Sequence, residues 1–221
     1  MAVTSISDLR SALDRHNVQV PDDSLPALVN YCGLLWNWNS RLNLTRHTDM
    51  DSFVCRDLID TLRLSQHLPQ GIRVLDVGSG GGVPGILLGI LRPDLKISLA
   101  ESVGKKAAAL NAIVRKLKLQ ITVYSDRAEN VLKKHRFDVL TVRAVAPLRK
   151  LLFWFQLRTG SFQKLLLIKG HRWIDELAKA KEAGLTDRAL VEVIDRYPTP
   201  GHDNDSVILS VTFSEAPAAN A

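Results

Sequence analysis

Apolar residues recur at helical spacing through the first seventy positions of the chain. The first predicted helix carries its apolar stripe at Ile6, Leu9, Leu13 and Val18. The same spacing predicts helices over residues 25–38 and 53–68, joined by a polar link at 39–45. We therefore predict that residues 1–70 form an N-terminal helical extension.

From residue 71 onward, short apolar runs alternate with amphipathic segments. The runs predict strands at 74–77, 96–100, 121–124, 137–142, 162–168, 190–196 and 206–213. Helices are predicted between them at 84–91, 105–117, 128–134, 148–157 and 173–183. Such alternation indicates an α/β fold with a mainly parallel seven-stranded sheet covered on both faces. The last two strands have no helix between them, which predicts an antiparallel edge.

These boundaries define the expected domains. The α/β domain covers residues 71–214, and residues 215–221 are expected to be a disordered tail. The length of 221 residues suits one large domain with a small extension. We see no apolar run of about 20 residues and no signal peptide, and Cys32 and Cys55 form no CxxC pair. We therefore expect a cytoplasmic monomer that uses no metal and contacts no membrane.

The positive charge is concentrated in one part of the chain. The net charge is +6, and residues 103–150 alone contain 12 basic and 3 acidic side chains. A local excess of this kind favours a polyanionic partner such as a nucleic acid. The alternative is a set of solvated helix faces, which the charge alone does not separate from a binding surface.

A glycine-rich loop connects the first predicted strand to the helix that follows. Glycines suit a loop that lies against a ligand, and the next helix start offers unpaired N–H groups. Gly80, Gly82 and Gly85 also satisfy the dinucleotide pattern G-x-G-x-x-G, and Gly78 is the first glycine after the strand. In a doubly wound sheet this position is a ligand site. A nucleotide-like cofactor is therefore expected here.

Two acidic residues favour S-adenosylmethionine over NAD as that cofactor. Asp76 lies inside the first strand, where it repels a pyrophosphate but attracts the sulfonium and ammonium groups of S-adenosylmethionine, directly or through water. Glu101 ends the second strand and can accept both ribose hydroxyls. The segment 126–129 follows the third strand, where an adenine edge is expected. NAD and a purely structural glycine turn are the alternatives.

The residue types restrict the methyl acceptor. Methylation of pyrimidine C5 requires a thiolate near the fourth strand, and neither cysteine lies there. The loop at 142–147 also lacks the Asn/Asp-Pro-Pro-aromatic pattern typical of adenine N6 methylation. Guanine N7 has a free lone pair and needs no general base, so the enzyme mainly has to position the reactants. These exclusions favour guanine N7.

At these residues the chain resembles the GidB family. The resemblance covers about residues 30–172 and is carried by Asn43-Leu44-Thr45, the glycine loop through Val83-Pro84-Gly85, 99–105, 125–129, 143–146 and Lys169-Gly170. It implies a class I Rossmann-like methyltransferase that uses S-adenosyl-L-methionine to methylate guanine N7 in small-subunit ribosomal RNA. It also implies that the cofactor is bound by Gly78, Val83, Ala128, Glu129 and Arg143.

Two basic residues are the candidate catalytic residues. Arg143 follows the fourth predicted strand and Lys169 ends the fifth, so both can orient the acceptor nucleotide. Cys55-Arg56-Asp57 stands where the family commonly has Arg-His, and a basic residue common near the end of the last strand is absent. These departures leave two alternatives: a methyltransferase of the same fold with a small-molecule or protein acceptor, and a non-catalytic RNA-binding assembly factor.

Overall fold

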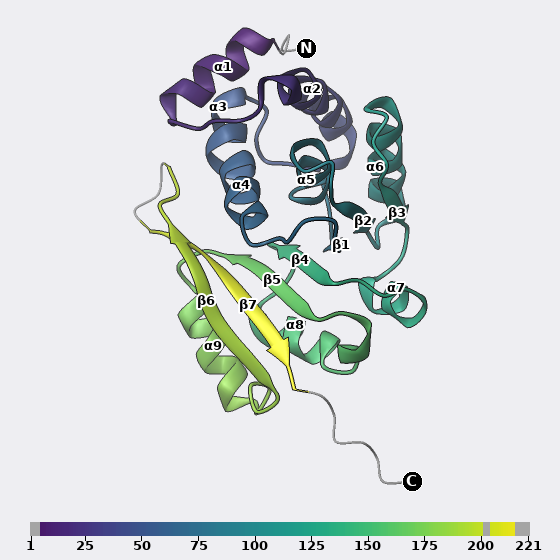
Figure 1. The fold of residues 1–221 in the computed structure, drawn as a ribbon, viewed down its shortest axis with the longest axis vertical. Helices are drawn as coiled ribbons and strands as arrows, with labels where there is room; N and C mark the ends of the chain where they lie inside the picture. Colours follow the sequence, from purple (N-terminus) through teal and green to yellow (C-terminus); the bar gives the residue numbers. More distant parts are fainter. Residues whose placement is uncertain (1–4, 201–203, 215–221) are drawn as a thin grey trace.

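The structure is a computed structural model that describes residues 5–200 and 204–214. The strands within these ranges are β1 (Arg73–Val77), β2 (Lys96–Ala100), β3 (Thr122–Tyr124), β4 (Val139–Arg143), β5 (Lys164–Lys169), β6 (Ala189–Tyr197) and β7 (Ser206–Phe213). In the described chain they form a seven-stranded sheet with the order β3-β2-β1-β4-β5-β7-β6 (Figure 1).

The sheet is mainly parallel, as predicted. Strands β1 to β5 pair in parallel, while β7 pairs antiparallel with both β5 and β6. The antiparallel edge was also predicted correctly, and β6 forms its outer strand although β7 is later in the chain. The predicted tail at 215–221 lies outside the described residues.

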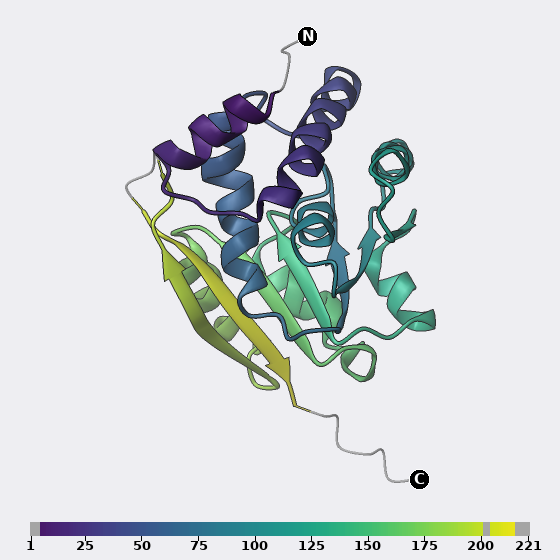
Figure 2. The ribbon, with the colours of Figure 1, turned by 45° about the horizontal axis from the view of Figure 1, so that its top comes forward.

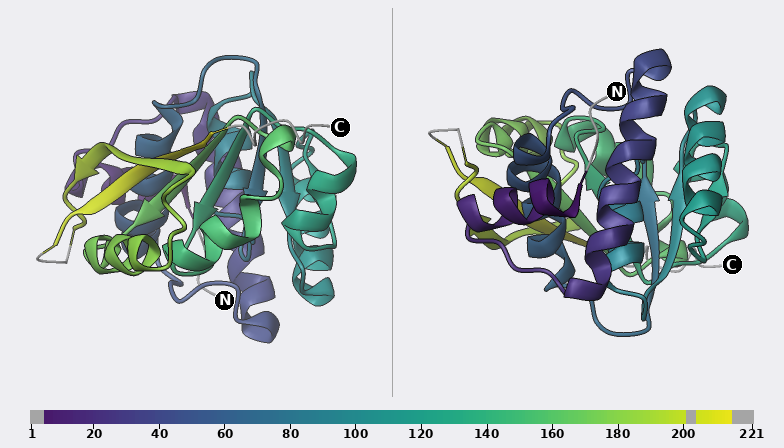
Figure 3. Two further views of the ribbon diagram at one scale, coloured as in Figure 1. Left: turned by 90° about the horizontal axis from the view of Figure 1, so that it is seen from below. Right: turned by 90° about the horizontal axis from the view of Figure 1, so that it is seen from above.

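Helices cover both faces of this sheet. They are α1 (Ile6–Arg15), α2 (Leu25–Leu42), α3 (Met50–Ser52), α4 (Ile59–Ser65), α5 (Gly85–Leu91), α6 (Gly104–Lys116), α7 (Ala128–Lys134), α8 (Leu148–Phe155) and α9 (Trp173–Glu182), with the short helical segments η1 (Asp22–Ser24), η2 (Phe53–Leu58) and η3 (Thr159–Ser161). Figure 2 shows α1, α2 and α4 together on one side of the sheet, and the two opposite views of Figure 3 show α8 and α9 on the other.

Alternate strand residues supply a separate hydrophobic core on each face. Val74 of β1 packs with α2, α4, α5 and α6, whereas its neighbour Leu75 packs with α7 and α8. This is the two-residue period of a strand buried on both sides. Asp76, two positions after Val74, therefore points to the face that carries the N-terminal helices.

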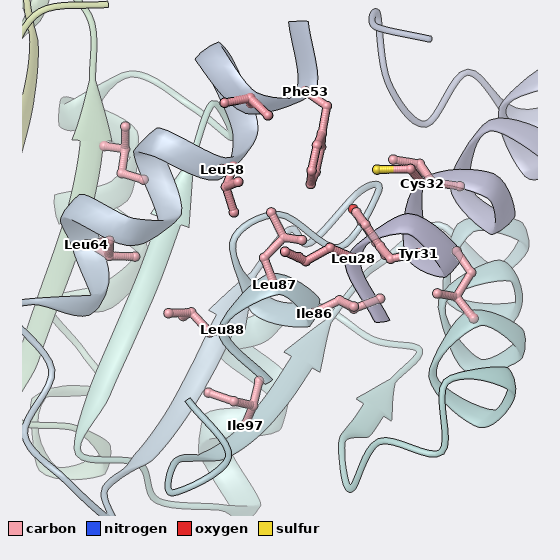
Figure 4. Close-up of a cluster of buried hydrophobic side chains, with 14 of the residues drawn as sticks. Leu28, Tyr31, Cys32, Phe53, Leu58, Leu64, Ile86, Leu87, Leu88 and Ile97 are labelled. Atoms are coloured by element: carbon pink, nitrogen blue, oxygen red, sulfur yellow. The ribbon is translucent and has the colours of Figure 1, made fainter. Parts of the chain in front are cut away.

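The N-terminal helices share the first of these cores with the sheet. Tyr31 and Phe53 are among the largest fully buried side chains, and both belong to that cluster. Figure 4 shows Phe53, Leu58 and Leu87 pointing toward one another between η2 and α5. The N-terminal segment is thus fastened to the sheet by buried apolar surface, which holds its polar residues in place over the carboxyl ends of the strands.

Two sequence predictions for the N-terminal segment were wrong in detail. Helix α2 continues to Leu42 and ends where Asn43 adopts a left-handed conformation with φ +48°, so only the last part of the predicted link at 39–45 lies outside the helix. The helix predicted at 53–68 begins earlier, at Met50 of α3, passes through a π-helical turn at η2 and ends at Ser65 of α4. A turn of this kind is not visible in a 3.6-residue period, because it inserts a residue without changing the apolar composition.

Candidate functional site

The glycine loop lies where β1 ends and α5 begins. The backbone N–H of Gly78 donates to the carbonyl of Ala100 at 2.8 Å, which ties the loop to the end of β2. Gly78 has φ +65°, and a Cβ on it would lie 2.7 Å from Cγ2 of Val145. A side chain at this position would therefore be strained and would collide with the loop after β4.

A cleft of about 700 Å³ opens beside this loop. One wall consists of the loop residues Gly78, Ser79, Gly80, Gly81 and Val83. The opposite wall comes from the segment after α2, from η2 and from the end of β4, including Asn43, Thr45, Arg46, His47, Asp57 and Arg143. Glu101 and Lys106 also line the cleft. The cleft therefore combines a backbone surface with charged groups of both signs.

Glu101 is held firmly against the glycine loop. Its Oε2 accepts the N–H of Gly80 at 2.9 Å, and its Oε1 accepts the N–H of Val103 at 2.8 Å. The residue is only 5% exposed but lines the cleft. Each carboxylate oxygen can accept a further hydrogen bond, so the two oxygens of Glu101 are fixed acceptors at the position predicted for a ribose.

Asp76 does not lie where the sequence argument put it. The residue is 1% exposed and does not line the cleft. Its carboxylate accepts hydrogen bonds from Thr141 Oγ1 at 3.1 Å and from the Gly85 N–H at 3.3 Å, and burial raises its pKa to about 6. The proposed direct attraction of a sulfonium is therefore corrected: Asp76 braces β4 and the start of α5 beneath the glycine loop.

Three other predicted cofactor residues also lie outside the lining of the cleft. Ala128 and Glu129 open α7, beyond the end of β3, and Gly82 lies on the far side of the glycine loop, where a Cβ would meet Ile86. From the set predicted to bind the cofactor, the structure brings Gly78, Gly80, Val83, Glu101 and Arg143 together.

Arg143 is the centre of a buried charge cluster. Its Nη2 lies 2.6 Å from Asp57 Oδ1 and its Nε lies 3.2 Å from Asp60 Oδ2, while Asp60 Oδ1 accepts the hydroxyl of Tyr197 at 2.8 Å. Burial lowers the pKa of Arg143, but Asp57 and Asp60 raise it by more, so its net shift is upward. The guanidinium is therefore a permanent cation, held by two carboxylates of the N-terminal segment.

Sequence reasoning did not identify several polar residues that line the cleft. They are Arg46, His47 and Asp57 of the N-terminal segment and Lys106 of α6, none of which was a predicted site residue. For Asp57 a signal existed, because a charged side chain stands within the predicted apolar helix at the family's Arg-His position. Arg46 and His47 follow the predicted polar link at 39–45, where composition does not separate a site from a turn.

Lys169 lies near the cleft but lines a second, neighbouring hollow. Its Nζ donates to Glu176 Oε2 at 2.7 Å and to the Ala146 carbonyl at 2.8 Å. Arg143 lines both hollows, so the two predicted catalytic residues meet at the second one.

Two further features are absent from the described residues. They contain no group of three or more His, Cys, Asp or Glu side chains that could hold a metal ion. Within residues 5–200 and 204–214, no helix is both long and apolar enough to cross a membrane.

Most of the chain matches a known protein family. The model of the GidB family, described as rRNA small subunit methyltransferase G, matches residues 24–200. A ribosomal RNA small subunit methyltransferase G of Rhodopirellula baltica is 42% identical over 87% of this chain and 83% of its own. Its counterpart in Halorhodospira halophila is 34% identical over 87% of this chain and 88% of its own.

Solved structures show the same fold at low identity. An O-methyltransferase from Bacillus cereus, in complex with SAH, superposes with a TM-score of 0.59 at 15% identity, covering 95% of this chain and 98% of that one. A ribosomal protein L11 methylase from Lactobacillus delbrueckii gives 0.53 at 13% identity, covering 71% and 78%. The chain belongs to the GidB family of ribosomal RNA small subunit methyltransferases, which confirms the predicted family, fold, enzyme class and S-adenosylmethionine dependence.

Proposed function

We propose that this protein transfers a methyl group from S-adenosylmethionine to N7 of a guanine in small-subunit ribosomal RNA. The observation that carries the proposal is the cleft at the carboxyl ends of β1, β2 and β4, in a chain of this family. There the glycine backbone, the Glu101 carboxylate and the Arg143 guanidinium converge.

The residues present fit a methyl donor of this kind. Glu101 can accept the ribose hydroxyls, and Gly78 and Gly80 line the cleft with backbone that carries no side chain. Arg46 and Lys106 line the same cleft and can pair with the carboxylate of the methionine part. When bound, S-adenosylmethionine supplies an electrophilic methyl group on a sulfonium.

Arg143 fits the acceptor side of the reaction. Its side chain is 19% exposed and lines both hollows, so the guanidinium can contact a nucleotide there. Since the pKa of Arg143 is shifted upward, the guanidinium cannot act as a base. Guanine N7 requires none, because its lone pair carries no proton, so Arg143 has only to orient the nucleotide toward the methyl donor.

Ribosomal RNA from a deletion strain provides the test. We expect mass mapping to show that one 7-methylguanosine of the small-subunit RNA is lost and that the wild-type gene restores it. A gene encoding Glu101→Gln should restore it poorly, because the amide replaces one of the two acceptor oxygens. If every 7-methylguanosine persists in the deletion strain, the proposal is wrong.

The compartment and the oligomeric state remain predictions. We propose that the enzyme acts as a monomer in the cytoplasm, where its RNA substrate is made. Sedimentation analysis of the purified protein and localisation of a tagged copy would test the two parts separately.

A further inference from the structure

A second hollow of about 510 Å³ lies beside the cofactor cleft. Arg56, Arg143 and Ala144 line both, so the two spaces meet along the segment that follows β4. Ala144 has φ +54°, an uncommon conformation for a residue with a side chain, and it turns this segment between the hollows. A ligand of nucleotide size fits the volume of the second hollow.

An ion pair of opposite charges stands at one side of this hollow. Lys169 uses one N–H for Glu176 Oε2 and another for the Ala146 carbonyl, which leaves a third N–H. Glu176 Oε2 also accepts the N–H of Leu148, whereas its Oε1 accepts no hydrogen bond from the described residues. A donor and an acceptor are therefore fixed side by side, each with unused capacity.

The other carboxylate that lines the hollow, Asp60, has a partner on each of its oxygens. It binds the Tyr197 hydroxyl through Oδ1 and Arg143 through Oδ2. Asp60 therefore holds the guanidinium, whereas Glu176 keeps one oxygen that accepts from no described residue and can accept from a ligand. Val145, which is 36% exposed, and Ile168 add apolar surface to the same hollow, which suits the face of a base.

This arrangement matches the Watson–Crick edge of guanine. That edge presents the O6 acceptor next to the N1–H and N2–H donors. The acceptor is complementary to a cation, and the two donors are complementary to a carboxylate beside it. Adenine presents the reverse order, a donor at N6 and an acceptor at N1. Recognition through this edge also leaves N7 unoccupied, which a methyl transfer to N7 demands, and it requires an unpaired base.

We propose that the second hollow binds the acceptor guanine, with Glu176 Oε1 accepting from N1–H and N2–H and Lys169 Nζ donating to O6. The inference rests on the proposed function and adds the residues that choose guanine over adenine. Glu176 thereby becomes a specificity-determining residue contributed by α9, far from the cofactor loop in the chain.

The test compares Glu176→Gln with the wild-type enzyme on two RNA substrates. Once the methylated guanosine has been mapped, the same RNA is prepared with inosine there, which keeps O6, N1–H and N7 but lacks the exocyclic amine. For the wild type we expect kcat/KM to be about tenfold lower on inosine. In Glu176→Gln we expect the guanosine rate to fall about 10- to 100-fold. Its guanosine-to-inosine ratio should then be close to one.

The ratio decides the outcome, because it does not depend on the fraction of active enzyme. Gln keeps an oxygen for Leu148 and Lys169, and Glu182→Gln, an exposed change on the same helix, is the matched control with a wild-type ratio. If the methylation rate of Glu176→Gln is too low to measure, Glu176→Asp is used in its place, and its guanosine-to-inosine ratio should also fall. A ratio that stays near ten in these variants overturns the inference. A wild-type enzyme that forms no 7-methylguanosine overturns the proposed function instead.

Discussion

The two walls of the cofactor cleft are built in different ways. The wall formed by Gly78 to Val83 and Glu101 uses residues within 24 positions of one another, joined by hydrogen bonds to backbone N–H groups. The opposite wall depends on Arg143 and Asp57, which are 86 positions apart and meet as a buried ion pair at 2.6 Å. The first wall follows from a local motif, while the second exists only because the N-terminal helices pack on the sheet.

This difference also determines how each wall should respond to substitution. Removing one partner of a buried ion pair lowers the stability of a protein much more than changing a neutral hydrogen bond does. The reason is that the remaining charge is left buried without compensation. The glycine wall contains mostly neutral backbone, so its vulnerability is steric and conformational. Three experiments compare the two walls, from the largest expected effect to the smallest.

Removal of the Arg143 side chain should cause the greatest loss. Arg143→Met leaves Asp57 and Asp60 buried beside each other without a cation. We expect the free energy of unfolding to fall by about 3–5 kcal/mol, measured by urea denaturation at pH 7. Asp57→Asn leaves Arg143 paired with Asp60 and should cost less, about 1–3 kcal/mol. Equal losses in the two variants would mean that charge balance does not hold this wall together.

The carboxyl group beneath the glycine wall should make stability depend on pH. The folded pKa of Asp76 is raised to about 6, whereas an unfolded aspartate titrates near 3.9, so the folded state binds a proton more readily. Its contribution to the free energy of unfolding is therefore present below about pH 4 and is lost as the pH rises to about 6. We expect a decrease of about 3 kcal/mol across this window.

Asp76→Asn provides the comparison for this pH effect. The amide does not titrate, so the difference between wild type and variant in urea denaturation should change between pH 4 and 6 and be constant above pH 7. Parallel curves for the two proteins across the whole range would show that Asp76 is not the group responsible.

The smallest of the three effects concerns the shape of the glycine wall. Gly78→Ala combines φ +65° with a Cβ 2.7 Å from Val145, and we expect a loss of about 1–3 kcal/mol in stability and weaker binding of S-adenosylhomocysteine. Gly71→Ala is a matched control, since Gly71 has φ +73° but nothing within 4 Å of a Cβ. It should lose stability through backbone strain alone and keep its ligand affinity in calorimetry. Similar losses of affinity in both variants would contradict a steric role for Gly78.

The predictions from sequence were most accurate where short-range patterns dominate. Strand β2 and helix α7 have the predicted bounds, and the strand, glycine loop and acidic residue at Glu101 form one side of the cleft. They succeeded because an apolar period, a glycine turn and a strand end are properties of neighbouring residues. Asp76 shows the limit of the same reasoning. Its place in a strand was predicted, but the direction of its side chain, away from the cleft, was not.

The alternating fold, the position of the cofactor loop and the family could all be predicted from the order of the residues. Three features become visible only in the folded chain: Asp57 and Asp60 hold Arg143, Lys169 is joined to Glu176, and a second hollow adjoins the cleft. The physical reason is the range of the interactions. Periodicity and turn chemistry act between near neighbours, whereas buried ion pairs depend on helix packing that brings distant segments together.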